Sequence, residues 1–300
     1  MYRDENRNIF WSKFFMKART VFIYFVLIVL SLLCIFTLYV LVINSTRDHF
    51  ALQRGFNPAI GTHIAHNYSL VFAKSGKGAA GPMLNIDSAF IVLKNSFIIA
   101  LFATFCSVYF STIVAYGIHM YRFKLRNAAF TFILVIMMIP TQVSTTGFVS
   151  ICYQNGWINN FLLLIIPSIA SPVTFFYIKQ YMESVLPFEM VEAARVDGAG
   201  EIRIFHQIVL PVMKPALAVQ IIFAFVTSWN NYFVPQLLLT GSENTTVPIM
   251  IHKLYSASDG SKDFGVINAV MVISVLPLIV VYFIFSRYIM KGLTLGAVKG

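Results

Sequence analysis

Charged residues are scarce in this sequence of 300 residues. Asp, Glu, Lys and Arg together make up 11% of it, and 58% is apolar, whereas about one quarter of an average soluble domain is charged. This composition excludes an ordinary water-soluble protein. The 29 phenylalanines also exclude intrinsic disorder, which requires few apolar residues and many charges. The chain is therefore expected to lie in a lipid bilayer.

Residue types that carry catalysis or bind metals are also few. The three cysteines are Cys34, Cys106 and Cys152, and their odd number and apolar surroundings favour small core residues over disulfides or metal ligands. His63 and His66 are three residues apart but have no third ligand at a suitable spacing. No His-Glu-x-x-His or Gly-x-Ser-x-Gly motif occurs. The sequence therefore predicts neither a metal site nor a catalytic residue.

Long apolar runs are abundant. A helix needs about 20 apolar residues to cross the hydrocarbon core, and six runs of roughly this length contain no Asp, Glu, Lys or Arg. The first is too long for a cleavable signal peptide and is expected to remain as a membrane helix. The fourth carries Pro167 and Pro172, which break a helix unless neighbouring groups compensate. The six predicted spans are Val21–Ile43, Ser96–Ile118, Ala128–Ile151, Phe161–Ile178, Ala216–Leu239 and Val266–Ser286.

The basic residues indicate the orientation of these spans. Residues 1–20, 119–127, 179–215 and 287–300 would share one side of the membrane, and they hold 15 of the 22 Lys and Arg residues. Cytoplasmic segments carry such an excess of positive charge, so both termini are expected in the cytoplasm. The basic residues flank the apolar segments instead of forming a patch, which argues against a nucleic-acid partner. The remaining basic residues, on the outer side, are Arg47, Arg54, Lys74, Lys77, Lys94, Lys253 and Lys262.

The chain has no visible source of energy for transport. Ion-coupled transporters usually place carboxylates or histidines inside the membrane, and here the closest candidates, His119 and Lys94, lie at the ends of spans. Lys77, in Ser75-Gly76-Lys77-Gly78, lacks both the first glycine of a phosphate-binding loop and the Ser or Thr that follows its lysine. Uphill transport would therefore require energy from another protein.

The cytoplasmic loop of residues 179–215 has the features of a docking element. Pro187 suits the start of a helix, and Glu189 and Glu192 place negative charge near its positive end. The helix would reverse at Gly198 and Gly200 and be followed by a second short helix over residues 201–209, which Leu210-Pro211 would end. Two short helices at an angle could carry the motion of a cytoplasmic partner to the membrane spans.

This loop resembles the cytoplasmic loop of ABC importer permeases. Their motif is Glu-Ala-Ala, three residues, Gly, nine residues, then Ile-x-Leu-Pro. Glu192-Ala193-Ala194, Gly198 and Ile208-Val209-Leu210-Pro211 match it at every fixed position. Seven specified residues at fixed spacing rarely agree by chance. The resemblance implies that Glu189, Glu192, Ala193, Ala194, Asp197 and Gly198 contact an ATPase.

The resemblance extends from about residue 85 to the C-terminus. Trp229-Asn230-Asn231-Tyr232-Phe233 is similar to a segment of sugar-importer permeases, as are Ile139-Pro140 and Asn155-Gly156-Trp157-Ile158-Asn159-Asn160. The tail over residues 287–300 is similar to the ending of maltose-type and multiple-sugar permeases. The chain is thus identified as a carbohydrate permease of the binding-protein-dependent transport system inner membrane component family.

This family implies a fold, a set of partners and an organisation. The fold is an all-α membrane protein with six transmembrane helices and type I ABC importer architecture. The partners are a second homologous permease, two cytoplasmic ATPases that bind ATP and magnesium, an extracytoplasmic sugar-binding protein and membrane lipid. The chain itself would hold no cofactor and would not be an enzyme. Residues 1–90 would form the cytoplasmic N-terminus, the first helix and the external loop. Residues 91–286 would form the core, which includes the loop 179–215, and residues 287–300 would form a cytoplasmic tail. The protein would be a multi-pass protein of the inner membrane.

Polar residues in the fifth predicted span are candidates for the sugar pathway. A polar side chain that faces lipid is costly, so Trp229, Asn230, Asn231 and Tyr232 are expected to face a cavity or another helix. Asparagines also join transmembrane helices to one another, and the sequence leaves these two roles open. Gln142, which follows Pro140, is expected to line the same route.

Two other classes of function compete with the importer. A self-sufficient facilitator or secondary transporter for a small polar solute would work without an ATPase. A membrane enzyme acting on lipid-linked sugars would need a carboxylate or metal cluster at one membrane face. The loop has enough carboxylates, but the alanines and glycines between them favour docking over catalysis.

Overall fold

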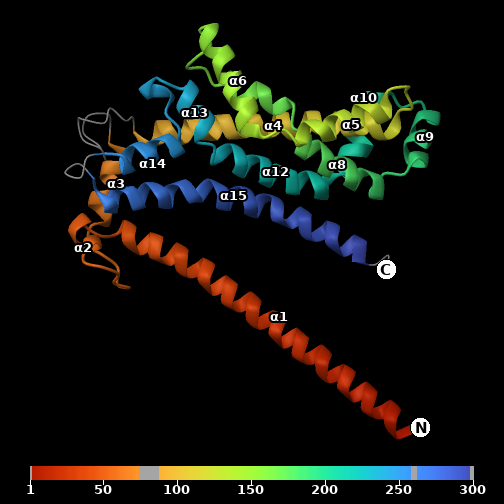
Figure 1. The fold of residues 1–300 in the computed structure, drawn as a ribbon, viewed down its shortest axis with the longest axis horizontal. Coiled ribbons are helices and arrows are strands. Elements are labelled where there is room, and N and C mark those ends of the chain that lie inside the picture. The colour runs from red at the N-terminus through yellow and green to blue at the C-terminus, as the bar shows by residue number, and fades with distance from the viewer. Residues whose placement is uncertain (1, 74–87, 258–261, 298–300) are drawn as a thin grey trace. The chain divides into compact units, whose positions relative to one another are not determined.

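A computed structural model describes residues 2–73, 88–257 and 262–297, and the side chains of residues 16–73, 88–257 and 262–289. Lys74 and Lys77 and the last three residues of the tail lie outside the described residues. The described chain contains helices and no strands (Figure 1). Its α-helices are α1 (Tyr2–Ser45), α2 (His49–Gln53), α3 (Ile64–Phe72), α4 (Ala89–Met120), α5 (Arg126–Met137), α6 (Thr141–Gln154), α7 (Leu162–Ile165), α8 (Pro172–Val185), α9 (Phe188–Val196), α10 (Glu201–Ile204), α11 (Leu210–Val212), α12 (Lys214–Trp229), α13 (Phe233–Leu238), α14 (Val247–Tyr255) and α15 (Phe264–Ala297). Its other helices are the 3-10 helices η1 (Ile166–Ile169) and η3 (Ser242–Asn244) and the π-helix η2 (Phe205–Val209).

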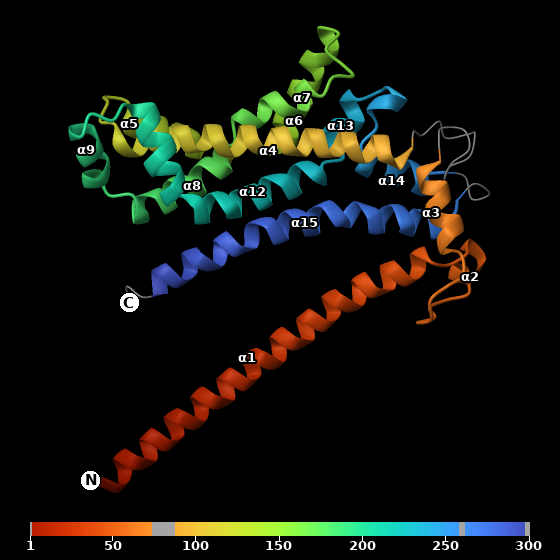
Figure 2. The ribbon, with the colours of Figure 1, turned by 180° about the vertical axis from the view of Figure 1, so that it is seen from behind.

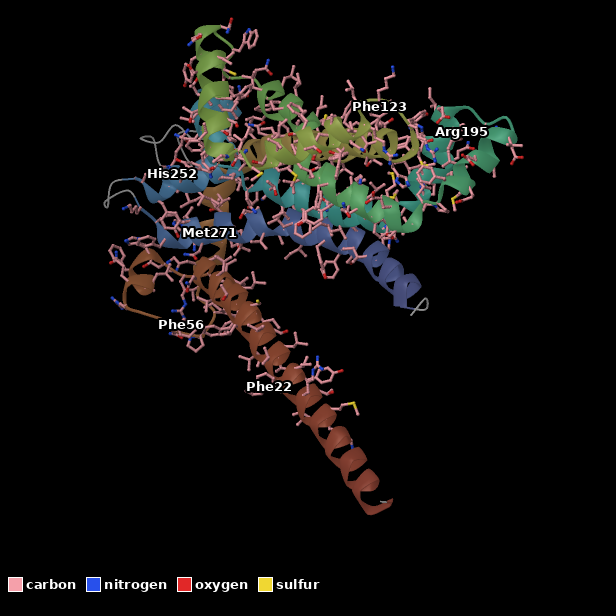
Figure 3. All side chains as sticks on the ribbon, turned by 45° about the vertical axis from the view of Figure 1, so that its right-hand side comes forward. Phe22, Phe56, Phe123, Arg195, His252 and Met271 are labelled. Carbon is pink, nitrogen blue, oxygen red and sulfur yellow. The ribbon has the colours of Figure 1, made fainter. Side chains whose placement is uncertain are left out.

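The chain forms two compact units. The first comprises residues 1–68 and 263–272, and the second comprises residues 69–262 and 273–300, so α15 contributes to both. In the first unit, α1 presents apolar side chains such as Phe22, which is 66% exposed (Figure 3). An exposed apolar helix of this length suits a bilayer and not water.

Asn67 organises the part of the first unit that follows α1. Its buried amide donates hydrogen bonds to the carbonyls of Ser45 and Arg47, where α1 ends. Gly265 passes so close to the Arg47 carbonyl that an added Cβ would collide with it. The His49 and Phe264 rings stack with their centroids 5.1 Å apart. The expected external loop thus contains two short helices, α2 and α3, and folds back on the end of α1.

α4 is the central helix of the second unit, and α8 and α12 pack along it (Figures 1 and 2). Small residues on one face of α4 allow this close approach, because they let helix backbones come together. They recur every three or four residues, and all are buried: Ser96, Ala100, Ala103, Ser107, Ser111 and Ala115. Two of these residues, Ala103 and Ser107, also line a cavity described below.

The prediction of six spans is confirmed when each bent pair of helices is counted as one span. Within the described ranges, four stretches are long and apolar enough to cross a membrane: Met16–Ser45, Ala89–Met120, Leu162–Val185 and Phe264–Ile289. The fourth predicted span survives its prolines because Pro167 lies in the 3-10 turn η1 and Pro172 in the first turn of α8, where a missing N–H is tolerated.

The other two spans are broken helices, which the sequence analysis did not anticipate. The third bends by 91° between α5 and α6, because Pro140 disfavours helical geometry at Ile139 and lacks the N–H that would continue the ladder. The fifth bends by 81° between residues 201–212 and 214–229. Helix α12 ends at Trp229 and not at Leu239, so Asn230 and Asn231, predicted to lie within the fifth span, are in a break between α12 and α13.

Asn159 holds together the loops at the end of the second unit where α13 and α14 lie. Its φ is +59°, an unusual value for a residue with a side chain. Its side-chain oxygen accepts hydrogen bonds from the Gly241 N–H (3.1 Å) and the Asn244 amide (2.8 Å). Its own N–H bonds to the Leu238 carbonyl at 2.7 Å. One side chain therefore links the loop after α6 to the loop before α14.

We expect Asn159→Ala to lower the thermal stability of the purified protein more than Asn159→Gly does. Both variants lose the side-chain hydrogen bonds, each worth about 1 kcal/mol. Only alanine also places a Cβ in the left-handed region, at about 1–2 kcal/mol. Thermal unfolding in detergent, followed by tryptophan fluorescence, measures the difference. Equal unfolding temperatures for the two variants would show that the backbone conformation of Asn159 contributes nothing.

Candidate functional site

The loop that the sequence predicts to be cytoplasmic folds into two short helices with a sharp reversal between them. Pro187 is the N-cap of α9, and Glu189 lies in its first turn, where the helix dipole favours negative charge. Gly198 has a φ of +80° directly after α9, whereas Gly200 has an ordinary φ of −70° and caps α10. The backbone conformation at Gly198 therefore requires glycine, whereas that at Gly200 is open to other residues. We call the segment 187–213 the coupling loop.

The second helix of the coupling loop runs further than expected. It was predicted to end at Leu210-Pro211, but π-helical η2 leads into α11, which continues to Val212. Pro211 is tolerated because it lies in the first turn of α11, where a missing N–H costs little. The sharp bend comes only at Met213, so the coupling loop joins α12 through a single residue.

A charged network fixes the reversal. Glu201 accepts a 2.7 Å hydrogen bond from Arg195 Nε and a 2.9 Å bond from the Tyr116 hydroxyl. The Arg195 guanidinium also lies over the Tyr121 ring, 5.4 Å from its centroid. These bonds hold the pKa of Glu201 down at about 2, with the Arg195 bond as the largest cause, and raise the pKa of Arg195. The network joins α9, α10 and the end of α4.

Apolar packing anchors the coupling loop to the membrane helices. Val191, Ile204, Val209 and Met213 are fully buried and belong to one core with residues of α4 and α8. His119, at the end of α4, adds a further contact, because its ring stacks on that of Phe188 with the centroids 5.0 Å apart. The loop and the two helices therefore form a continuous packed body, through which a push on the loop would reach the spans.

The structure separates the six predicted docking residues into two groups. Five of them are exposed: Glu189, Glu192, Ala193, Asp197 and Gly198. Ala194 is only 8% exposed and packs into the core beneath α9. Ala194 is therefore placed to support the helix, because its small side chain lets α9 approach its neighbours.

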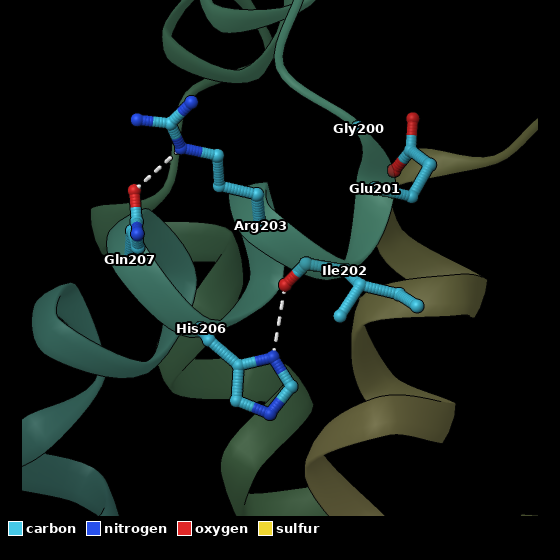
Figure 4. A pocket seen from close by; sticks show the side chains of 6 residues that line it. All are labelled: Gly200, Glu201, Ile202, Arg203, His206 and Gln207. Atoms are coloured by element: carbon cyan, nitrogen blue, oxygen red, sulfur yellow. Dashed lines mark hydrogen bonds between the residues drawn. The ribbon is translucent and has the colours of Figure 1, made fainter.

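The outward face of the coupling loop also carries apolar residues that sequence analysis missed. Val196 is 87% exposed and Ile202 is 79% exposed. Ile202 lines a shallow hollow together with Gly200, Glu201, Arg203, His206 and Gln207 (Figure 4). In this hollow, Arg203 Nε donates to Gln207 at 2.9 Å, and His206 Nδ1 bonds to the Ile202 carbonyl at 2.8 Å. Exposed apolar residues rimmed by polar groups are typical of protein–protein contacts.

A second candidate site lies where α12 ends. Trp229 is buried, stacks on Phe225 and donates a 3.1 Å hydrogen bond to the Ser274 carbonyl, so its indole joins α12 to α15. Asn230 and Asn231 lie in the break between α12 and α13, and Tyr232 immediately precedes α13. Irregular backbone at membrane depth is tolerated only inside protein or beside a water-filled cavity.

Two cavities are lined by residues of this break. The smaller, of about 440 Å³, is lined by Trp229, Asn230, Tyr232, His252, Tyr255 and neighbouring apolar residues. Tyr232 and His252 face each other with ring centroids 4.7 Å apart. Within the second unit, His252 lies toward one end, and Arg195, which belongs to the coupling loop, lies toward the other (Figure 3).

The larger cavity, of about 800 Å³, lies among α4, η1, α8 and α12. Asn231 lines it together with hydroxyl and amide side chains that the sequence analysis did not select: Ser107, Ser168, Ser171, Thr174, Tyr177, Gln220, Thr227 and Ser228. We call it the polar cavity.

The predicted pathway residues are thus divided. Trp229, Asn230 and Tyr232 line the smaller cavity, Asn231 lines the polar cavity, and Gln142 is exposed on α6 and lines neither. The sequence did contain a signal for the missed α12 residues. Gln220, Thr227 and Asn231 are seven and four residues apart, which is the spacing of residues on one helical face, although α12 itself ends at Trp229. A search for polar residues at helical spacing in an apolar span would have found them.

No group of three or more possible metal ligands occurs in the described part of the chain. The His63 and His66 rings meet edge to face, 6.2 Å apart. The three cysteines are free and differ in burial: Cys34 is exposed, Cys106 is partly buried and Cys152 is buried.

Comparison with known proteins agrees with this geometry. Residues 107–294 match the binding-protein-dependent transport system inner membrane component family. The arabinooligosaccharides transport system permease protein AraQ of Bacillus subtilis (strain 168) is 33% identical over 90% of this chain and 92% of its own length. The sn-glycerol-3-phosphate transport system permease protein UgpE of Yersinia pestis bv. Antiqua (strain Antiqua) is 31% identical over 92% of this chain and 96% of its own length.

The fold has a solved counterpart. A chain of a bacterial ABC transporter involved in the import of the acidic polysaccharide alginate superposes with a TM-score of 0.74 at 20% identity, over 91% of this chain and 96% of that one. The likeness confirms the expected all-α permease architecture. This multi-pass membrane protein belongs to the binding-protein-dependent transport system inner membrane component family.

Proposed function

We propose that this chain is a permease subunit of an ATP-driven importer that moves a sugar, such as an oligosaccharide, into the cytoplasm. The coupling loop carries this proposal. Its reversal at Gly198 is fixed by the Arg195–Glu201 pair, its outer face is exposed, and its inner face is packed against α4 and α8. Such an element suits the transfer of motion from a docked protein to membrane helices.

We assign the hydrolysis of ATP to other subunits of the importer. Two cytoplasmic ATPase subunits would bind ATP and magnesium, and one of them would contact Glu189, Glu192, Ala193, Asp197 and Gly198. A second homologous permease would complete the pathway, and an extracytoplasmic binding protein would deliver the sugar. Both termini would lie in the cytoplasm, on the side of the coupling loop. Permease family membership and the sugar named for AraQ support this assignment.

Purification of the tagged chain from its native membranes, followed by mass spectrometry, tests the assembly. We expect a second permease and an ATPase to be recovered with it. Proteoliposomes containing that complex and the binding protein should then accumulate sugar only when ATP is present on the cytoplasmic side. Sugar transport by the purified chain alone, without ATP, would instead identify a facilitator.

A further inference from the structure

The polar cavity contains an amide side chain without a protein partner. Gln220 is 7% exposed and lines the cavity, and its side chain makes no hydrogen bond with the described part of the chain. Its amide atoms are not among the described side-chain atoms that are both sealed from solvent and unpartnered, so they are open to the cavity and can bond to a ligand or water there. Thr227, on α12, and Asn231, in the break after α12, line the same cavity.

The chemistry of the lining selects among ligands. Among the described residues that line the cavity, none is Asp, Glu, Lys, Arg or His. A buried anion requires a charged partner or several directed N–H groups. Amides and hydroxyls both donate and accept hydrogen bonds, and they therefore match sugar hydroxyls. Tyr177 and Phe223 add aromatic faces for the apolar side of a sugar ring.

We propose that the polar cavity binds an uncharged sugar during transport and that Gln220 hydrogen-bonds to its hydroxyls. The inference rests on the proposed function and narrows it, because it excludes anionic solutes such as the glycerol phosphate and alginate named for the relatives. A volume of about 800 Å³ lies within the usual range for small-molecule sites, roughly 300–1,000 Å³.

Cysteine protection in the reconstituted complex tests this binding site. Thr227→Cys is introduced into a chain whose Cys34, Cys106 and Cys152 are replaced by alanine, and its reaction with N-ethylmaleimide is timed. Ser256→Cys, exposed after α14, is the matched control. The test solutes are arabinotriose and maltotriose, which are neutral, and glycerol 3-phosphate and an alginate trisaccharide, which are anionic. Uptake of each solute is measured in parallel.

We expect a neutral sugar to be imported. When it occupies about 90% of the sites, it should slow the labelling of Thr227→Cys at least about tenfold, since an occupied site does not react. The control should be labelled at an unchanged rate, and anionic solutes should not protect. Gln220→Leu should raise the apparent KM for the neutral sugar by about 5–10-fold, because one hydrogen bond of about 1 kcal/mol is lost.

The contrary outcomes are distinguishable. Import of an anionic solute that protects Thr227→Cys would overturn the inference and leave the importer assignment standing. Import of a neutral sugar with unchanged labelling and an unchanged KM in Gln220→Leu would show that the sugar passes elsewhere. Failure of the intact complex to import any of the four solutes, despite ATP hydrolysis, would overturn the inference and contradict sugar import.

Discussion

Uptake by the reconstituted complex should fall to background when Gly198 is replaced by valine, while the protein still inserts into the membrane. Space is not the reason, because an added Cβ would meet no atom within 4 Å. The reason is the φ of +80°, which a β-branched residue adopts only with strain. The backbone would relax to a negative φ and turn α9 away from α10, so the docking face would no longer fit a partner.

Gly200 provides a matched control for this substitution. It lies two residues away, is equally exposed and also has no atom within 4 Å of an added Cβ, but its φ is −70°. Gly200→Val should therefore keep most of the uptake. Uptake and ATP hydrolysis are measured for both variants at equal amounts of membrane-inserted protein. Normal transport by Gly198→Val would refute the docking role of the coupling loop.

Glu201→Ala should reduce uptake roughly fivefold and leave ATP hydrolysis poorly coupled to transport. The substitution removes the bonds to Arg195 and Tyr116 that join α9, α10 and α4. The Glu201 side chain is 44% exposed, so the network stabilises this arrangement of the helices by only about 1 kcal/mol. A loss of that size changes an equilibrium constant roughly fivefold. The measured quantity is the number of sugar molecules imported per ATP hydrolysed.

A double-mutant cycle distinguishes this network from a general loss of folding. If Glu201 and Arg195 act as a pair, the double variant should lose no more coupling than either single variant. Tyr116→Phe, which removes only one hydrogen bond to Glu201, should have a smaller effect. Independent, additive losses in the double variant would show that the two residues do not act together.

The same network predicts how stability depends on pH. The pKa of Glu201 is lowered from its ordinary 4.5 to about 2, so the folded state favours the ionised carboxylate. Its contribution to stability is complete above about pH 4.5 and is lost as the pH falls toward 2. Thermal unfolding of the purified protein between pH 5 and 3 should therefore show a smaller decline for Glu201→Gln than for the wild type. Identical pH profiles would contradict this role for Glu201.

The sequence was sufficient for the features that depend on local composition. Apolar length located six spans, and the motif around Gly198 located the reversal of the coupling loop. The broken helices were missed because a run of apolar residues such as 128–151 looks the same whether or not it bends at Pro140. The end of α12 at Trp229 was missed for the same reason, since Asn230 and Asn231 are compatible with a helix.

The candidate site was predictable only in part. Exposure of Glu192 and Ala193 follows from their places in a short amphipathic helix, but the burial of Ala194 depends on which side of α9 meets α4 and α8. The polar cavity was missed because its lining comes from distant parts of the chain, such as Ser107, Ser171 and Gln220. Residues brought together by tertiary packing leave no continuous pattern in the sequence.

The break after Trp229 has a consequence for hydration. The last carbonyls of any helix have no helical partner, and in hydrocarbon each would cost several kcal/mol. The Asn230 and Asn231 N–H groups bond to the Val226 and Ser228 carbonyls, and side chains at the break line the two cavities. Water in these cavities could bond to the remaining carbonyls at the end of α12, so the break would bring water to the end of this helix.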